Sequence, residues 1–192
     1  MRNWIILVLI FSFPSLIFGQ AASLSDGDNI YYYATINEAF KAAEFYNSSI
    51  DKPIEITLIE DIVLNASLVI SDNKHIILVP GTASVTIQRS ADNIDFPLIW
   101  IRGESASVTL GKPEMEYELI IDGGNLNDPP ILAHAPLITI NGRDSKLIMH
   151  GKVTLQNNHN VAAVPTVHQY QNGAAVYPIF PPRNLTYTSK KS

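Results

Sequence analysis

The strongest constraint on this chain is a series of short apolar runs rich in Val and Ile, each bounded by turn residues. Runs of this kind are typical of short β-strands. No helical pattern separates them, which disfavours alternating strand and helix units. The runs cover 54–59, 68–70, 76–79, 85–87, 98–101, 108–110, 119–121, 137–140, 147–149 and 153–155.

Two of these runs are copies of one another. Pro97–Gly103 (PLIWIRG) returns as Pro136–Gly142 (PLITING), 39 positions later, and residues 107–110 match residues 146–149 in the same register. A fixed repeat of this length is typical of stacked-coil architectures. Residues 118–123 lie about halfway between the copies, so 39 residues are interpreted as two coils of about 20 residues each. The repeat therefore predicts an all-β fold in which coils of three short strands stack as a parallel β-helix. The alternative is an antiparallel sandwich, which has no fixed long register.

One helix is expected just before the first run, over residues 35–46. Thr35 can cap it, and Glu38 three residues later completes a capping box. Its expected role is to cover the apolar end of the first coil. The apolar face would consist of Ile36, Ala39, Phe40 and Ala43, which recur at helical spacing.

The N-terminus predicts export. After a single basic residue the chain is almost wholly apolar up to Phe18, and two small residues, Gly19 and Ala21, follow. This pattern is typical of a secretory signal peptide over residues 1–21, cleaved between Ala21 and Ala22. The alternative, an uncleaved anchor, is disfavoured because a spanning helix needs about 20 apolar residues. We expect no membrane span after cleavage.

Composition excludes several kinds of protein. The net charge is −5 and no basic stripe is present, which argues against nucleic-acid partners. The chain has no cysteine, so disulfides and Cys-based zinc sites are excluded. The remaining length of about 170 residues fits one domain. We expect a lead-in over 22–34, the β-helix domain over 35–160, and an irregular, Pro-containing tail over 161–192.

A family resemblance rests on six segments in order. Residues 35–43 followed by 54–58 resemble the start of pectin-lyase-like, right-handed parallel β-helix proteins. When four later segments are added, the set resembles the N-terminal region of adhesin-like repeat proteins of bacterial surfaces. The resemblance implies a right-handed β-helix and an exported, non-enzymatic surface protein. The further segments are 74–81, 85–89, 119–124 and 153–158.

Searches for chemistry-bearing motifs predict no catalytic, metal-binding or cofactor-binding residues. There is no Gly-x-Ser-x-Gly string, no His pair at helical spacing, and none of the Asp-Asp, Gly-His-Gly or Arg-x-Lys signatures of polysaccharide hydrolases of similar fold. The alternating Glu114, Glu116 and Glu118 are interpreted as the solvated outer face of a strand-like stretch. Candidate ligand contacts are Trp100, which takes the position of Thr139 in the second copy, together with Asp122 and Asp128.

These observations predict an exported, non-catalytic protein that binds an extracellular glycan or a host or surface protein. A first alternative is a polysaccharide lyase or glycoside hydrolase on the same fold, because a fold does not determine function. A second alternative is a truncated fragment without independent function. The resembling proteins continue into many glycine-rich coils, whereas this sequence turns proline-rich near its end.

Overall fold

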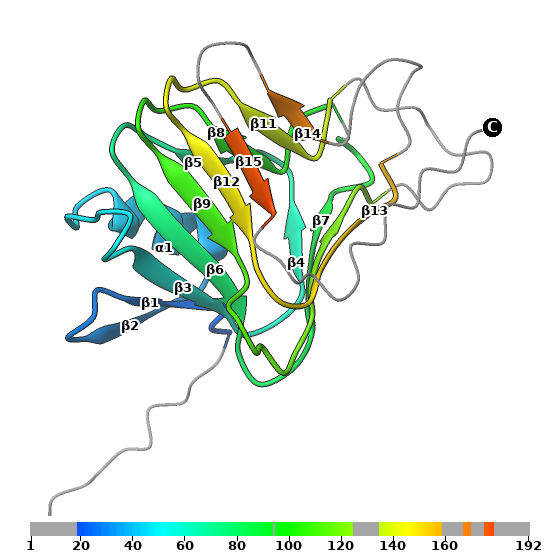
Figure 1. The fold of residues 1–192 in the computed structure, drawn as a ribbon. Coiled ribbons are helices and arrows are strands. Elements are labelled where there is room, and N and C mark those ends of the chain that lie inside the picture. Colours follow the sequence, from blue (N-terminus) through cyan, green and yellow to red (C-terminus); the bar gives the residue numbers. More distant parts are fainter. Residues whose placement is uncertain (1–18, 94, 125–134, 159–166, 170–174, 179–192) are drawn as a thin grey trace, which may run out of the picture.

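The computed structural model describes residues 19–93, 95–124, 135–158, 167–169 and 175–178. These residues form one helix and a set of short strands, which the chain contributes in turn to three sheets (Figure 1). The predicted signal peptide therefore lies almost entirely outside the described residues.

The largest sheet has seven strands, in the order β15-β12-β9-β6-β3-β1-β2. Its strands are β1 (Ala22–Ser25), β2 (Ile30–Tyr33), β3 (Ile54–Leu58), β6 (His75–Pro80), β9 (Ser107–Leu110), β12 (Lys146–Met149) and β15 (Ala175–Pro178). Strands β1 and β2 pair antiparallel with each other, and β1 pairs antiparallel with β3. All other pairs in this sheet are parallel, so the sheet is mixed.

The other two sheets have four parallel strands each. One has the order β13-β10-β7-β4, with β4 (Ile62–Leu64), β7 (Val85–Arg89), β10 (Leu119–Asp122) and β13 (Val153–Gln156). The second has the order β14-β11-β8-β5, with β5 (Leu68–Ile70), β8 (Ile99–Ile101), β11 (Ile138–Ile140) and β14 (Val167–Gln169). From β3 onward, each sheet receives every third strand of the chain.

The core lies between the sheets and follows the period-two alternation of the strands. In β3, for example, Ile54, Ile56 and Leu58 are buried while the residues between them are partly exposed. Equivalent buried positions recur in neighbouring strands, so Ile99 lies beside Ile138. The result is one continuous apolar cluster that includes residues from all three sheets and the helix.

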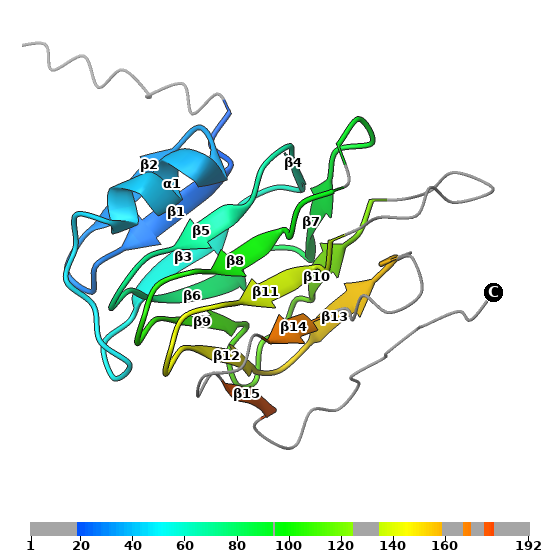
Figure 2. The same ribbon diagram turned by 90° about the horizontal axis from the view of Figure 1, so that it is seen from above.

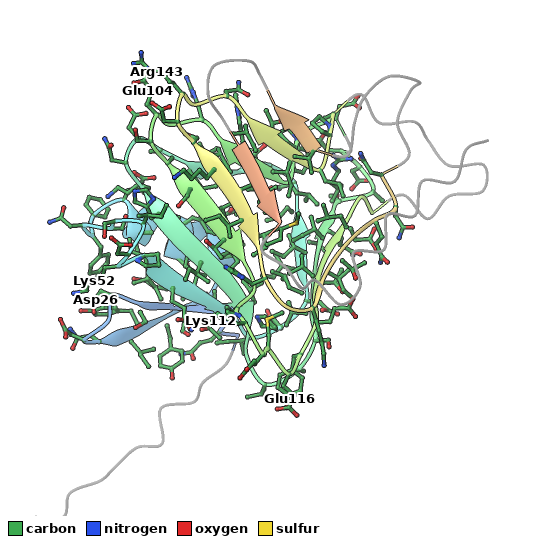
Figure 3. The ribbon with its side chains drawn as sticks, viewed as in Figure 1. Asp26, Lys52, Glu104, Lys112, Glu116 and Arg143 are labelled. Atoms are coloured by element: carbon green, nitrogen blue, oxygen red, sulfur yellow. The ribbon has the colours of Figure 1, made fainter. Side chains whose placement is uncertain are left out.

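The two copies of the repeat lie side by side in the predicted 39-residue register, but the 39 residues pass once through the three sheets and do not form two coils of about 20. Trp100 pairs with Thr139, and Ser107 pairs with Lys146, in both cases 39 positions apart. The turns that follow β8 and β11 stack in the same register. Glu104 and Arg143 are 39 positions apart, and Arg143 Nη2 lies 3.0 Å from Glu104 Oε2. Figure 3 shows these two side chains together at one corner of the molecule.

The expected helix is present as α1 (Ile36–Ala43), three residues shorter than predicted at its C-terminal end. Thr35 is the N-cap, and its side chain and that of Glu38 form the predicted capping box. At the other end, the Lys74 ammonium donates hydrogen bonds to the carbonyl oxygens of Glu44 and Tyr46, both at 2.7 Å. These bonds satisfy carbonyls that a helix terminus leaves without intrahelical partners.

The predicted fold class, an all-β right-handed parallel β-helix over residues 35–160, is wrong. The described residues form a mixed α/β arrangement of three separate sheets, one mixed and two parallel, with one short helix. The error arises because a repeat period carries no information about strand direction outside the repeat. Residues 22–34, expected as a lead-in, form the antiparallel strands β1 and β2.

Three further strands were not anticipated as strands: β4, β14 and β15. Strand β4 has only three residues and follows β3 after a short connection, so its apolar pattern merges with that of the preceding run. Strands β14 and β15 fall within residues 161–192, which were expected to be irregular, and each pairs in parallel with a strand of the second sequence copy.

Candidate functional site

A groove of about 370 Å³ lies between α1 and β5. The helix supplies one wall, and β5 with the residues on either side of it supplies the other. Figure 2 shows α1 at one end of the strand array, close to β5. The lining residues are Asn37, Phe40, Lys41 and Glu44 on the helix side, and Ser67, Leu68, Val69 and Ser71 on the strand side.

The helix wall follows directly from helical spacing. Asn37, Lys41 and Glu44 are separated by four and three positions, so they lie on one side of α1, and all three are exposed. The capping box at Thr35 sets where the helix begins and therefore which residues face the groove. Phe40, beside them, turns toward the core and is only 6% exposed.

The strand wall follows from alternation. Leu68 and Ile70 point into the core, while Val69 between them is exposed and faces outward. Ser67 and Ser71, at the two ends of β5, are partly buried. The groove therefore has an apolar strip in which Val69 is exposed and Phe40 and Leu68 are nearly buried, and polar side chains flank this strip.

The flanking groups offer both hydrogen-bond donors and acceptors. An amide (Asn37), an ammonium (Lys41), a carboxylate (Glu44) and two hydroxyls surround the apolar strip. A few polar groups around an apolar floor are typical of binding sites for small molecules and short polymers. One carboxylate is present among the lining residues.

Trp100 extends this surface onto the next strand. It is the partner of Val69 in the parallel pair of β5 and β8, and it is partly buried. The Arg102 guanidinium carbon lies 5.5 Å from the centroid of the Trp100 ring, a distance at which a cation interacts favourably with the ring face. The indole Nε1 atom is buried and has no hydrogen-bond partner among the residues that the structure describes.

Asp122 occupies a different place. It ends β10, in a different sheet from Trp100, and is 6% exposed. Its carboxylate accepts hydrogen bonds from the Gly124 amide at 2.7 Å, from Gln156 Nε2 at 2.7 Å and from Asn157 Nδ2 at 2.9 Å. These three donors hold the turn that follows β10 against the end of β13, which gives Asp122 a structural role.

The two glycines after Asp122 belong to this turn. Gly124 has φ of +71°, in the left-handed region that favours glycine. A Cβ atom on Gly123 would lie 2.0 Å from the Asn157 carbonyl oxygen. The predicted Asp122-Gly123-Gly124 turn is therefore confirmed, and close backbone approach explains one glycine while positive φ explains the other.

The remaining acidic candidates do not form a site with Asp122. Asp128 lies outside the described residues. The expectation that Glu114, Glu116 and Glu118 alternate along a strand is wrong, because residues 112–118 form turns and Glu114 has φ of +58°. Glu118 instead accepts a hydrogen bond from the Thr154 hydroxyl.

Arg89 is a buried cation that sequence reasoning missed. It is 2% exposed, and its Nη2 atom donates to the carbonyl oxygen of Ala135 at 3.0 Å and to that of Pro136. Burial lowers its pKa to about 10, an effect opposed by the charge of Asp95. The available signal was the alternation along VTIQR, which places Arg89 on the same buried face as Val85 and Ile87.

The groove residues Asn37, Lys41 and Glu44 were also missed as a set. Their helical spacing was readable, but the strand they face lies more than twenty positions further along the chain. Within the described residues, no group of three or more His, Cys, Asp or Glu side chains could hold a metal ion. The described part of the chain also contains no helix long and apolar enough to span a bilayer.

Comparisons with protein-family models, curated proteins and solved structures found no match to this chain. The resemblance to pectin-lyase-like and adhesin-like proteins therefore stays a prediction.

Proposed function

We propose that this protein is an exported, non-catalytic binding protein, and that the groove between α1 and β5 takes a glycan. The observation that carries the proposal is the composition of the groove, an apolar strip of Phe40, Leu68 and Val69 bordered by amide, ammonium, carboxylate and hydroxyl groups. Sugars present apolar C–H faces together with hydroxyls that both donate and accept hydrogen bonds. They therefore match an apolar strip that is bordered by polar groups.

Trp100 supports the same ligand class. Aromatic rings offer a large apolar surface with low conformational cost. Because Val69 and Trp100 are partners on adjacent strands, a chain of sugar units lying across β5 and β8 would pass from the groove onto the indole region. Arg102, stacked on the ring, adds hydrogen-bond donors at that end.

The non-catalytic part of the proposal is supported by the carboxylates. Hydrolysis by the usual glycosidase mechanisms needs two carboxyl groups about 5–10 Å apart. Glu44 stands alone among the lining residues, and Asp122 is engaged by three donors at the end of another sheet. The export part of the proposal is supported by the apolar N-terminal segment and by the small residues that follow it.

The test is a panel of soluble and insoluble polysaccharides incubated with residues 20–192. Depletion of protein onto the glycan and release of new chain ends are measured on the same samples. Depletion without new chain ends is the expected result, and release of new ends would replace the binding proposal by a hydrolase or lyase.

Matched variants connect binding to the groove. Asn37→Ala and Lys41→Ala should each weaken binding by about tenfold, the change that follows from about 1.4 kcal/mol of lost contact energy. Asn29→Ala and Lys52→Ala are controls of the same residue types on the β1–β2 turn and the α1–β3 connection, outside the groove. Equal losses in both pairs of variants would reject the groove as the site.

A further inference from the structure

The junction between the apolar N-terminal segment and the folded chain lies at residues 19–22. Ala21 is 7% exposed and Ala22 is 0% exposed. The Ala21 amide donates to the Tyr33 carbonyl oxygen at 3.0 Å, and the Ala21 carbonyl oxygen accepts from the Ile59 amide at 2.9 Å. Ala21 therefore binds the chain on both sides of β1, at the end of β2 and just after β3.

Figure 1 makes the position of β1 clear, since it lies between β2 and β3. Cleavage after Ala21 would remove both of these hydrogen bonds. It would also place an α-ammonium group on Ala22, a residue that is 0% exposed while Ala21 is present. Backbone groups that lose a hydrogen-bond partner destabilise the fold, and so does a charge brought next to the apolar core.

The residues just before Ala21 have a different environment. Gln20 is partly exposed, and a Cβ atom built on Gly19 would have no atom within 4 Å. Gly19 also has φ of +72°, in the left-handed region that favours glycine, so the extended strand conformation does not include it. A chain that begins at Gln20 keeps every hydrogen bond of Ala21 and places its α-ammonium outside the core.

We infer that the leader is removed between Gly19 and Gln20, so that the folded protein retains Ala21. This inference rests on the proposed export. Sequence alone favours cleavage after Ala21, because Gly19 and Ala21 are both small, whereas cleavage after Gly19 places Ile17 two residues upstream of the last leader residue. The burial and hydrogen bonding of Ala21 reverse that preference.

The first test is the N-terminus of the full chain after secretion by a host that processes its native leader. No Lys or Arg occurs between Gln20 and Lys41, so trypsin yields one peptide from the mature terminus to Lys41. A peptide beginning at Gln20 is expected. It can carry a free amine or the lactam formed when that amine attacks its own side-chain amide carbon and ammonia leaves.

A peptide beginning at Ala22 would overturn the inference and leave the proposed export intact. Retention of the leader would overturn both. Glycan binding by residues 20–192 is measured separately, so its failure would not be confused with either result.

The second test measures what Ala21 contributes. Residues 20–192 and residues 22–192 are each released from a cleavable tag with a native first residue, and their thermal unfolding is compared. The shorter chain should unfold at a midpoint lower by about 4 °C or more. Equal midpoints would show that Ala21 is dispensable to the fold and would overturn the inference.

Discussion

Strands β5 and β2 are both terminal strands of their sheets, and the chain covers them very differently. The buried face of β5 continues into the apolar face of α1, and Leu68 and Ile70 are 1% and 0% exposed. Strand β2 carries Ile30 at 62% and Tyr32 at 58% exposure. One terminal strand therefore belongs to the core, and the other lies largely outside it.

The comparison shows what an amphipathic helix can and cannot stabilise. A terminal strand leaves a row of backbone groups unpaired on one side. The apolar face of α1 packs into the same core cluster as Leu68 and Ile70 of β5. Strand β2 also contacts α1, but Ile30 and Tyr32 stay exposed, and the strand is held by its hydrogen bonds with β1 and by a ring contact of Tyr31 with Tyr46 at 5.8 Å between centroids. We expect stability to be concentrated at the α1–β5 contact.

Two phenylalanines near one another in sequence give the largest contrast. Phe40→Ala removes a side chain that is 6% exposed against the core and should lower the free energy of unfolding by about 3–5 kcal/mol. Phe45→Ala removes one that is 84% exposed and should change it by less than about 0.5 kcal/mol. Denaturant unfolding of both variants measures the difference, and comparable losses would contradict the assignment of the core to the α1–β5 side.

A smaller effect is expected at the start of the helix. Thr35→Ala removes the N-cap side chain that accepts the Glu38 amide and should cost about 1 kcal/mol. Thr35→Ser retains the hydroxyl and is the matched control. If the two variants were equally stable, the capping box would not be what holds α1 over β5.

The smallest effect concerns the Tyr31–Tyr46 contact on the β2 side. A hydrogen bond with Tyr31, followed by desolvation, raises the pKa of Tyr46 from 10.0 to about 12. Because the folded state favours the neutral phenol, this contribution to stability is fully present below pH 10.0 and is lost as the pH rises through about 12. Phenolate absorbance of the folded protein should therefore show a late step.

Two tyrosine variants test whether the late step in phenolate absorbance comes from Tyr46. Tyr46→Phe should lower the amplitude of this step, to which Tyr33 also contributes because desolvation raises its pKa. Tyr32→Phe, on the outer face of β2, should leave the amplitude unchanged. An unchanged amplitude in Tyr46→Phe would mean that the ring contact does not tie β2 to the end of the helix.

Much of the local structure was predictable from sequence. The capping box at Thr35 and the apolar spacing of α1 depend on residues within one turn of each other, so the helix start was predicted correctly. The 39-residue repeat likewise predicted equivalent positions for Trp100 and Thr139. Its interpretation as two coils of about 20 residues was wrong, because the two residues pair directly on neighbouring strands.

The candidate site was less predictable. Trp100 was identified, and it adjoins the groove through Val69. Asp122 was chosen for its charge, but its three hydrogen-bond donors come partly from β13 and could not be read from its own surroundings. The groove residues were missed because their significance depends on β5, which a loop and two further strands separate from α1.

By itself, the sequence determined where the helix begins, where most strands run and which strands share a register, because period and capping are local or repeated signals. Only the tertiary structure decided that Ala22–Ser25 pairs antiparallel with β3, that Ala21 is buried, and that α1 forms a groove with β5. Each of these depends on contacts between segments that carry no common pattern. Their free energy comes from burial and backbone pairing, which exist only once the chain has folded.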